Sequence, residues 1–212
     1  MQRGLPGHEP RCLFVHLPMR LADSGYSLVE LMLAMAMIAT LSAIAIPRLT
    51  TSLDDHRALG AARYLSTRFH RTRMEAITRS NEVALRFARV NGQFSYTPHA
   101  DGNGNGVRNQ DIANGVDRPI GPSEKLADQF TGVDFGVLAG LPAVESGAAP
   151  PGDDPIKLGA SNLLSFSANG TSSTGSVYVR GRHSQYVVRI YGVTAKTRVL
   201  KFWPDANQWR PL

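Results

Sequence analysis

Cysteine is almost absent from this chain: Cys12 is the single cysteine in 212 residues, and it precedes the first long apolar run. Disulfides within the chain, and cysteine-ligated metal sites beyond that run, are therefore excluded. The histidines after the run are scattered without metal-ligand spacing: they are His56, His70, His99 and His183. Packing must stabilise the downstream part of the chain, with at most an oxygen-ligated ion.

Enzyme motifs are lacking as well. The stretch "GTSSTG" at residues 170–175 is not a nucleophile elbow, and no glycine-rich phosphate loop precedes a helical segment. The sequence therefore predicts no catalytic residues and no organic cofactor.

Acidic residues are outnumbered. The chain has 17 Asp and Glu against 23 Lys and Arg, and its formal net charge is +6, so nucleic acid, anionic lipid or an acidic protein are candidate partners. The alternative is that the charge serves solubility or docking to an acidic subunit. If DNA is bound, the candidate contacts are cations that the last two strands could place side by side: Arg182, Lys196, Arg198 and Lys201.

The run from Tyr26 to Ile46 contains no lysine, arginine or glycine, and Glu30 is its one charged residue. As a helix, its 21 residues would be about 31 Å long, enough to cross a hydrocarbon layer of roughly 30 Å. Pro47 then marks the far end of this helix or a kink in it. The sequence thus predicts a membrane-spanning helix with one carboxylate near its start.

Two interpretations of this run are general ones. In a plain signal anchor, Glu30 reaches the lipid head groups. In a secretory signal peptide, Arg20 forms the basic region, residues 28–41 form the apolar region, and cleavage after Ala45 releases a soluble protein. Neither explains why a glycine directly precedes the run.

The stretch "GYSLVEL", followed by the apolar run and "IPRL", resembles the class III signal of type IV prepilins and pseudopilins. In that family a dedicated aspartic peptidase cuts after the glycine, here Gly25, on the cytoplasmic side and methylates the new N-terminus, here Tyr26. The family's acid at the fifth mature position and its proline at the twenty-second coincide with Glu30 and Pro47. Tyr26 replaces the usual phenylalanine, and Met19 is the expected initiator because it gives a short leader.

The resemblance gives Glu30 a role in assembly. A carboxylate inside a bilayer costs about 2 to 3 kcal/mol, so it should pair with the N-terminal amine of a neighbouring subunit. The partners implied are other pseudopilins or pilins at a filament tip, the prepilin peptidase and inner-membrane lipid.

Beyond Pro47 the pattern becomes that of an amphipathic helix ending near Ser80 and Asn81. The face predicted to pack on the chain's own domain consists of Leu65, Phe69, Thr72 and Ala76. Arginines on the other faces are expected to be solvated: Arg63, Arg68, Arg71 and Arg79.

Alternation of apolar and polar residues begins after Asn81, and the "NG" at 91–92 predicts a hairpin turn. Strands are expected at 82–90, 93–97, 163–167, 175–181, 185–192 and 197–203. The predicted fold class is α+β, a long N-terminal helix packed on an antiparallel β-sheet head. The expected divisions are a leader at 1–25, a transmembrane helix at 26–46, its amphipathic continuation at 47–80 and a β-rich head at 81–212.

The segment "LSFSANGTSSTGSVYVRG", residues 164–181, is similar to a region of the GspH/FimT pseudopilins, with Phe166, Gly170 and Gly175 at corresponding places. Glycines between strands also indicate ordinary tight turns. "TAKTRV" at 194–199 departs from the family pattern, because alanine and lysine replace its glycine and arginine. The resemblance implies a minor pseudopilin of a type II secretion system; the alternative is a minor type IV pilin that binds DNA during uptake.

The resemblance also implies a single-pass protein of the bacterial inner membrane with its C-terminal domain in the periplasm. The distribution of basic residues favours the opposite orientation, with the C-terminal domain in the cytoplasm. Fewer basic residues precede the run (Arg11, Arg20) than follow it (Arg48, Arg57, Arg63). We give the resemblance more weight, since long domains cross membranes largely regardless of charge.

The loop after residue 100 resembles the opening of a calcium loop. Oxygen-bearing side chains alternate with glycines there, so they could converge on one hard cation. The candidate ligands are the side chains of Asp101, Asn103, Asn105 and Asp111 and the carbonyl of Val107. The twelfth position holds Ile112 instead of a bidentate acid, so Asp111 or Asp117 would have to close the site, and a flexible polar turn is the alternative.

We predict that the mature protein, isolated from a host with the peptidase, begins at methylated Tyr26. Intact-mass measurement checks this, and a Gly25→Leu variant should keep its leader. A mass that corresponds to a start at Ile46, or an uncut wild-type leader, would contradict the prepilin interpretation.

Overall fold

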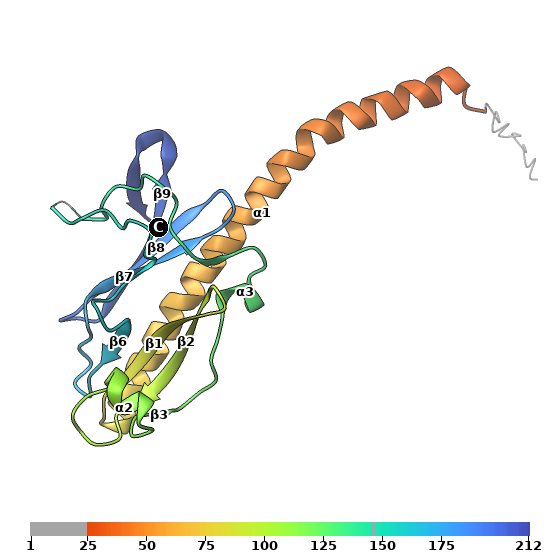
Figure 1. Ribbon diagram of the computed structural model, residues 1–212. Helices are drawn as coiled ribbons and strands as arrows, with labels where there is room; N and C mark the ends of the chain where they lie inside the picture. The colour runs from red at the N-terminus through yellow and green to blue at the C-terminus, as the bar shows by residue number, and fades with distance from the viewer. Residues whose placement is uncertain (1–24, 146) are drawn as a thin grey trace, which may run out of the picture. The chain divides into compact units, whose positions relative to one another are not determined.

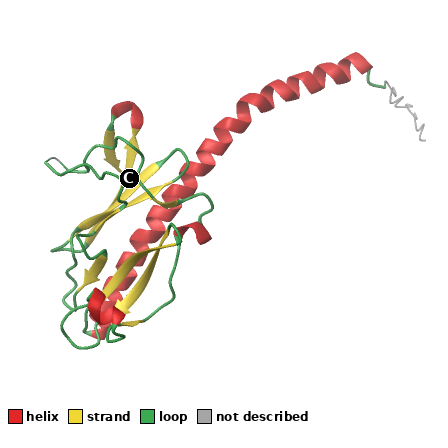
Figure 2. Ribbon diagram, viewed as in Figure 1, coloured by secondary structure: helices red, strands yellow, loops and turns green. Residues whose placement is uncertain are grey.

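The computed structural model describes residues 25–145 and 147–212, so the expected leader and Met19 lie outside the described residues. The chain divides into two compact units, one that ends at Ile44 and one from Ala45 to Leu212. Helix α1, Leu28–Arg79, contributes to both, and the strands belong to the second (Figures 1 and 2).

Pro47 does not end α1, which was one of the two alternatives that the sequence left open. Proline lacks the amide hydrogen that a helix interior uses. Thr50 and Thr51 lie one turn further along α1, and their hydroxyls donate to the carbonyl oxygen of Pro47 at 2.9 and 3.0 Å. The predicted amphipathic continuation is therefore the same helix.

The C-terminus of α1 is closed by a left-handed residue, Ser80, with φ of 51°. Its N–H donates to the carbonyl of Ile77 at 3.1 Å, and the N–H of Asn81 donates to that of Ala76 at 3.2 Å. This pair of bonds is the Schellman motif, and it confirms the predicted end of the helix.

One face of α1 is buried in the second unit, and the four residues predicted for it are among those buried. The rest of this face is mainly alanine. Because alanine lacks a bulky side chain, the helix axis can lie close to the strands. The buried positions are Asp54, Ala58, Ala61, Ala62, Leu65, Phe69, Thr72 and Ala76.

The strands form two antiparallel sheets. The first has the order β3-β2-β1-β6 and the second the order β10-β9-β8-β7-β4, with β5 also paired to β7. The first sheet is built from β1 (Val83–Val90), β2 (Gln93–Ala100), β3 (Arg118–Pro119) and β6 (Leu163–Phe166). The second is built from β4 (Asp134–Phe135), β5 (Ile156–Lys157), β7 (Gly175–Arg180), β8 (Gln185–Tyr191), β9 (Lys196–Trp203) and β10 (Gln208–Pro211).

The predicted hairpin turn lies between β1 and β2, where Asn91 and Gly92 have φ of 51° and 81°. Two consecutive positive φ values are typical of the type I′ turn, whose twist matches that of the strands. Val90 accordingly pairs with Gln93 and Val83 with Ala100.

A single core cluster joins the buried face of α1 to both sheets. It contains Leu85 and Tyr96 from the first sheet and Val179 and Val188 from the second. The expected α+β class, with a helix packed on an antiparallel head, is confirmed.

Two features differ from the sequence-based expectations. The short helices α2 (Asn109–Ala113) and α3 (Leu126–Gln129) and the strands β3, β4, β5 and β10 were not predicted. Arg68 was expected to be solvated, but its side chain is only 10% exposed and its Nη2 lies 2.7 Å from Glu124 Oε1. That expectation was wrong because the acid comes from a loop far away in sequence.

We predict that Phe69→Ala lowers the free energy of unfolding of the detergent-solubilised chain by about 3 to 5 kcal/mol, because it leaves a cavity under both sheets. Met74→Ala is the matched control, since Met74 on the same helix is 57% exposed. Urea denaturation followed by tryptophan fluorescence measures both. Equal effects of the two variants would contradict the assigned helix face.

Candidate assembly site

The first unit presents apolar side chains on all sides of α1. Leu28, Met32 and Ile38 are 74%, 64% and 63% exposed, and nothing in the described part of the chain buries the most apolar stretch of this helix. By length and composition α1 is the helix, among the described residues, that could cross a membrane. Such a surface needs lipid or other helices around it.

Of the residues predicted for processing and assembly, Gly25, Tyr26 and Glu30 lie together at the start of α1, and Pro47 lies in its interior. Gly25 and Tyr26 are exposed, and a Cβ built on Gly25 would meet no atom within 4 Å. Packing within the described chain therefore does not require a glycine there. Glu30 lies in the first helical turn, where the helix dipole favours an acid.

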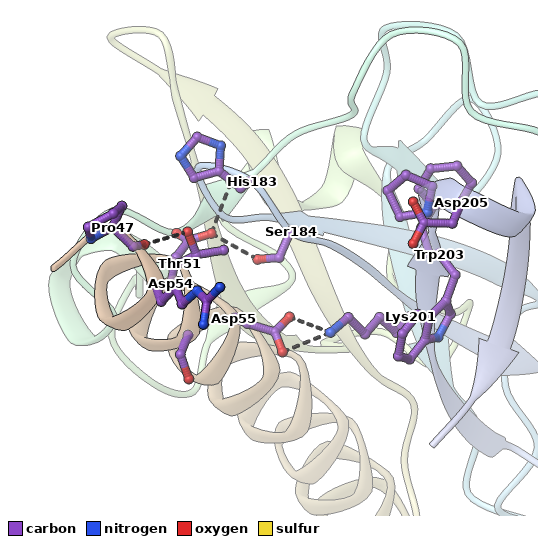
Figure 3. Close-up of a pocket in the computed structure, with 13 residues that line it drawn as sticks. Pro47, Thr51, Asp54, Asp55, His183, Ser184, Lys201, Trp203 and Asp205 are labelled. Carbon is purple, nitrogen blue, oxygen red and sulfur yellow. Dashed lines mark hydrogen bonds and ion pairs between the residues drawn. The ribbon is translucent and has the colours of Figure 1, made fainter. Parts of the chain in front are cut away.

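In the second unit a groove of about 710 Å³ separates α1 from the hairpin of β9 and β10 (Figure 3). We call it the α1–β9 groove. Its wall on α1 consists of Pro47, Arg48, Thr51, Ser52, Asp54 and Asp55. Its other walls consist of His183, Ser184, Lys201, Phe202, Trp203, Pro204 and Asp205.

Asp54 closes one end of the groove by binding the turn between β7 and β8. Its Oδ1 accepts the N–H of Arg182 at 2.8 Å, and its Oδ2 accepts the N–H of His183 at 2.9 Å and the hydroxyl of Ser184 at 3.1 Å. We call this arrangement the Asp54 clamp. A side chain at Gly181 would not fit, because its Cβ would lie 2.8 Å from Asp54 Oδ2.

The clamp holds Asp54 ionised although its side chain is buried. Burial alone would raise the pKa of this carboxyl, but the hydrogen bonds from Arg182, His183 and Ser184 outweigh it and lower the pKa below its ordinary value of 3.8. The carboxylate therefore fastens α1 to the second sheet across the whole neutral range.

The adjacent Asp55 binds two further strands. Its Oδ1 accepts the hydroxyl of Tyr186 on β8 at 2.8 Å and lies 2.7 Å from Lys201 Nζ on β9, which also donates to Oδ2 at 2.8 Å. Burial, together with this carboxylate, raises the pKa of Tyr186 well above its ordinary value of 10. The phenol thus stays a donor.

Sequence reasoning missed Asp54 and Asp55. A signal was present, since these are the only acids between Glu30 and Glu75 in a helix rich in arginine. Their partners lie some 130 residues away in the sequence, so their role could not be read from local pattern.

The four candidate DNA contacts do not share one surface. Lys196 and Arg198 are exposed on β9, where residues two apart face the same way, and the guanidinium of Arg198 lies over the ring of Tyr191. Lys201 is three residues after Arg198, so its side chain lies on the opposite face of β9, where it pairs with Asp55 of α1. The fourth, Arg182, contributes its backbone N–H to the Asp54 clamp.

The candidate calcium loop is closed by its own hydrogen bonds. Asp101 Oδ1 accepts the N–H groups of Asn103 and Gly104, and its Oδ2 accepts that of Gly106, at 2.8 to 3.0 Å. Burial opposes the charge on Asp101, but these bonds lower its pKa.

Other expected ligands are also engaged within the loop. The Asn105 amide donates to Asp111 Oδ2 at 3.1 Å, and Asp117 accepts two backbone N–H groups. The structure brings Asn105 and Asp111 together, but among the described residues no group of three or more His, Cys, Asp or Glu side chains is arranged to hold a metal ion. Calcium binding stays a prediction from the sequence.

We predict that Asp54→Asn lowers the free energy of unfolding by about 1 to 3 kcal/mol at neutral pH, because the amide cannot accept all three hydrogen bonds. A carboxyl whose folded pKa is depressed contributes stability above its unfolded pKa and loses it as the pH falls through the folded value. The difference from wild type should therefore shrink below about pH 3.8.

The control is Asp205→Asn, which changes an exposed acid of the same groove. Urea denaturation of both variants across pH measures the effect. A constant difference down to pH 2 would argue against the clamp.

Comparison with known proteins gives two family matches. The family described as type II transport protein GspH matches residues 61–194, and the prokaryotic N-terminal methylation motif matches residues 20–46. No curated protein matches. Among solved structures, the minor pseudopilin EPSH from the type II secretion system of Vibrio cholerae is 11% identical, with a TM-score of 0.35 over 74% of this chain and 94% of that one.

The two family matches fall on different parts of the molecule. The methylation motif covers the exposed apolar stretch of α1 up to Pro47, which indicates single-pass membrane anchoring. The GspH match covers most of the buried part of α1, from Ala61 on, and the strands as far as the end of β8, more than half of the chain. The chain therefore belongs to the GspH family of type II transport proteins.

Proposed function

We propose that this chain acts as a minor pseudopilin, a structural subunit of the type II secretion pseudopilus. The observation that carries the proposal is that both family matches lie on one continuous helix and its head. The methylation motif ends one residue before Pro47, and the GspH match begins at residue 61 of the same α1. One element thus joins a membrane and assembly segment to a folded domain.

The first unit supplies the assembly surface in this proposal. Its side chains are exposed around the helix, so neighbouring helices can replace lipid on every side. Glu30 adds direction, because a carboxylate that costs about 2 to 3 kcal/mol in lipid gains a partner when it meets a neighbour's N-terminal amine. Cleavage after Gly25 by a prepilin peptidase creates that amine.

The second unit supplies the head that meets other subunits or exported protein. The Asp54 clamp and the Asp55 contacts fix α1 to β8 and β9 close to the end of the apolar run. The part of α1 that belongs to the second unit is therefore fixed to the head. We place the helix in the inner membrane and the head in the periplasm.

The alternative, a DNA-binding minor pilin, has less support. The family model concerns type II transport, and the four candidate cations are divided among opposite faces of β9 and a backbone contact. A structural family of this kind also gives no support to an enzyme activity.

In a host that lacks this chain, we predict that wild-type protein restores secretion and that Glu30→Gln restores it about tenfold less, as expected for loss of an ion pair worth some 1.4 kcal/mol. Insertion and cleavage should be unchanged, since the variant keeps the glycine and the apolar run. Secretion of an exported protein and co-purification with other pseudopilins measure the effect.

Glu75→Gln is the matched control, because Glu75 on the same helix pairs only with the exposed Arg71 among the described residues. Equal rescue by both variants would make Glu30 a passive residue. Loss of DNA uptake with normal secretion in the deletion strain would favour the alternative function.

A further inference from the structure

We propose that the tip of the β9–β10 hairpin, centred on Trp203, binds the headgroup layer of the membrane that holds the apolar run. The partner is the lipid surface itself. The inference rests on the membrane insertion in the proposed function, but not on a role in secretion.

The position of the hairpin follows from contacts within the second unit. Pro47 and Thr51 line the same groove as Trp203 (Figure 3), and the apolar run ends at Ile46, directly before Pro47. The headgroup layer is about 5 to 7 Å thick on each side of the hydrocarbon, and the four steps from Pro47 to Thr51 cover about 6 Å of helix. Pro47 and Thr51, which line the groove with Trp203, therefore follow the apolar run within about the thickness of the headgroup layer, measured along the helix.

The hairpin projects beyond its sheet. Pairing between β8 and β9 stops at Tyr186 and Lys201, whereas β9 and β10 continue to the pair Trp203 and Gln208. The dark blue hairpin in Figure 1 accordingly extends past β8. A short helical turn, Pro204–Ala206, closes it with exposed residues.

Trp203 has the chemistry of an interfacial residue. It is 40% exposed, so part of the indole ring is open to its surroundings. Lys201 Nζ lies 4.9 Å from the ring centroid and the Arg210 guanidinium 5.7 Å. An amphipathic ring with cations beside it is typical of the membrane–water interface, where Trp and Tyr form belts.

The charges around the tip favour an aromatic contact over a polybasic one. Asp54 and Asp55 are engaged in contacts within the protein. The charges of the groove and hairpin outside the described salt bridges are then the cations Arg48 and Arg210 and the exposed acid Asp205. The nearly balanced charge predicts that the contact depends little on anionic lipid. This separates it from an electrostatic patch.

The test uses the two tryptophans of the chain. Trp209→Phe leaves Trp203 as the single fluorophore. Trp203→Phe leaves Trp209, which is half-buried against Phe202 and Tyr178 and donates to the carbonyl of Pro142 at 2.9 Å. Both full-length variants are reconstituted into phosphatidylcholine and phosphatidylethanolamine vesicles that carry a nitroxide either near the headgroup or deep in the acyl chain.

We expect the headgroup nitroxide to quench Trp203 about twofold more than Trp209, and more than the deep nitroxide does, as for an interfacial ring. Added phosphatidylglycerol should leave this ratio unchanged. Trp209 emission in Trp203→Phe reports that the hairpin is still folded.

Three results would overturn the proposal. If the protein floats with the vesicles but the nitroxides do not quench Trp203, the hairpin proposal is overturned and the membrane anchoring stands. If the protein fails to float, the proposed membrane anchoring is overturned as well. Shielding of Trp203 that grows with the protein-to-lipid ratio would identify a second copy, not lipid, as the occupant of the groove.

Discussion

The packing of one helix face against two sheets is the contact on which the head depends. Ala58, Ala61 and Ala62 are completely buried, and their small size brings α1 close to strands of both sheets at once. Leu65 and Phe69 then fill the space between the sheets. Without α1, each sheet would expose an apolar face to water, so the helix is part of the head as much as it is its connection to the membrane.

Polar contacts at both sides of this core fix the helix in one register. Near the start of the second unit, Asp54 and Asp55 bind the turn after β7 and the strands β8 and β9. Further along, Glu124 accepts the hydroxyls of Tyr64 and Tyr96 at 2.8 and 2.9 Å and pairs with Arg68. Apolar packing alone tolerates sliding by a turn, but buried charges with several partners do not.

The sequence predicted the elements whose signal is local. Alternation located the long strands within about one residue at most ends, apart from β2, which continues three residues further, and the "NG" pair located the first turn. It could not predict Arg68 with Glu124 or the Asp54 clamp, because each depends on partners distant in the chain. The β9–β10 hairpin was missed for another reason: β10, Gln208–Pro211, is too short to show a clear alternation and ends in a proline. The loop after Asp101 shows a different limit. Acids and glycines that suggest a calcium site also form Asx-type turns, and here each Asp101 oxygen accepts a backbone N–H.

The Asp54 clamp has a mechanical consequence. In the second unit, the contacts of Asp54 and Asp55 are the first polar ones between α1 and the strands after the apolar run, so tension along α1 reaches them before the packed face. The hydrogen bonds of Asp54 and Asp55 reach α1 from three places in the second sheet, the β7–β8 turn, β8 and β9. An axial load on this part of α1 is therefore distributed over three places in one sheet, in addition to the packed face further along the helix.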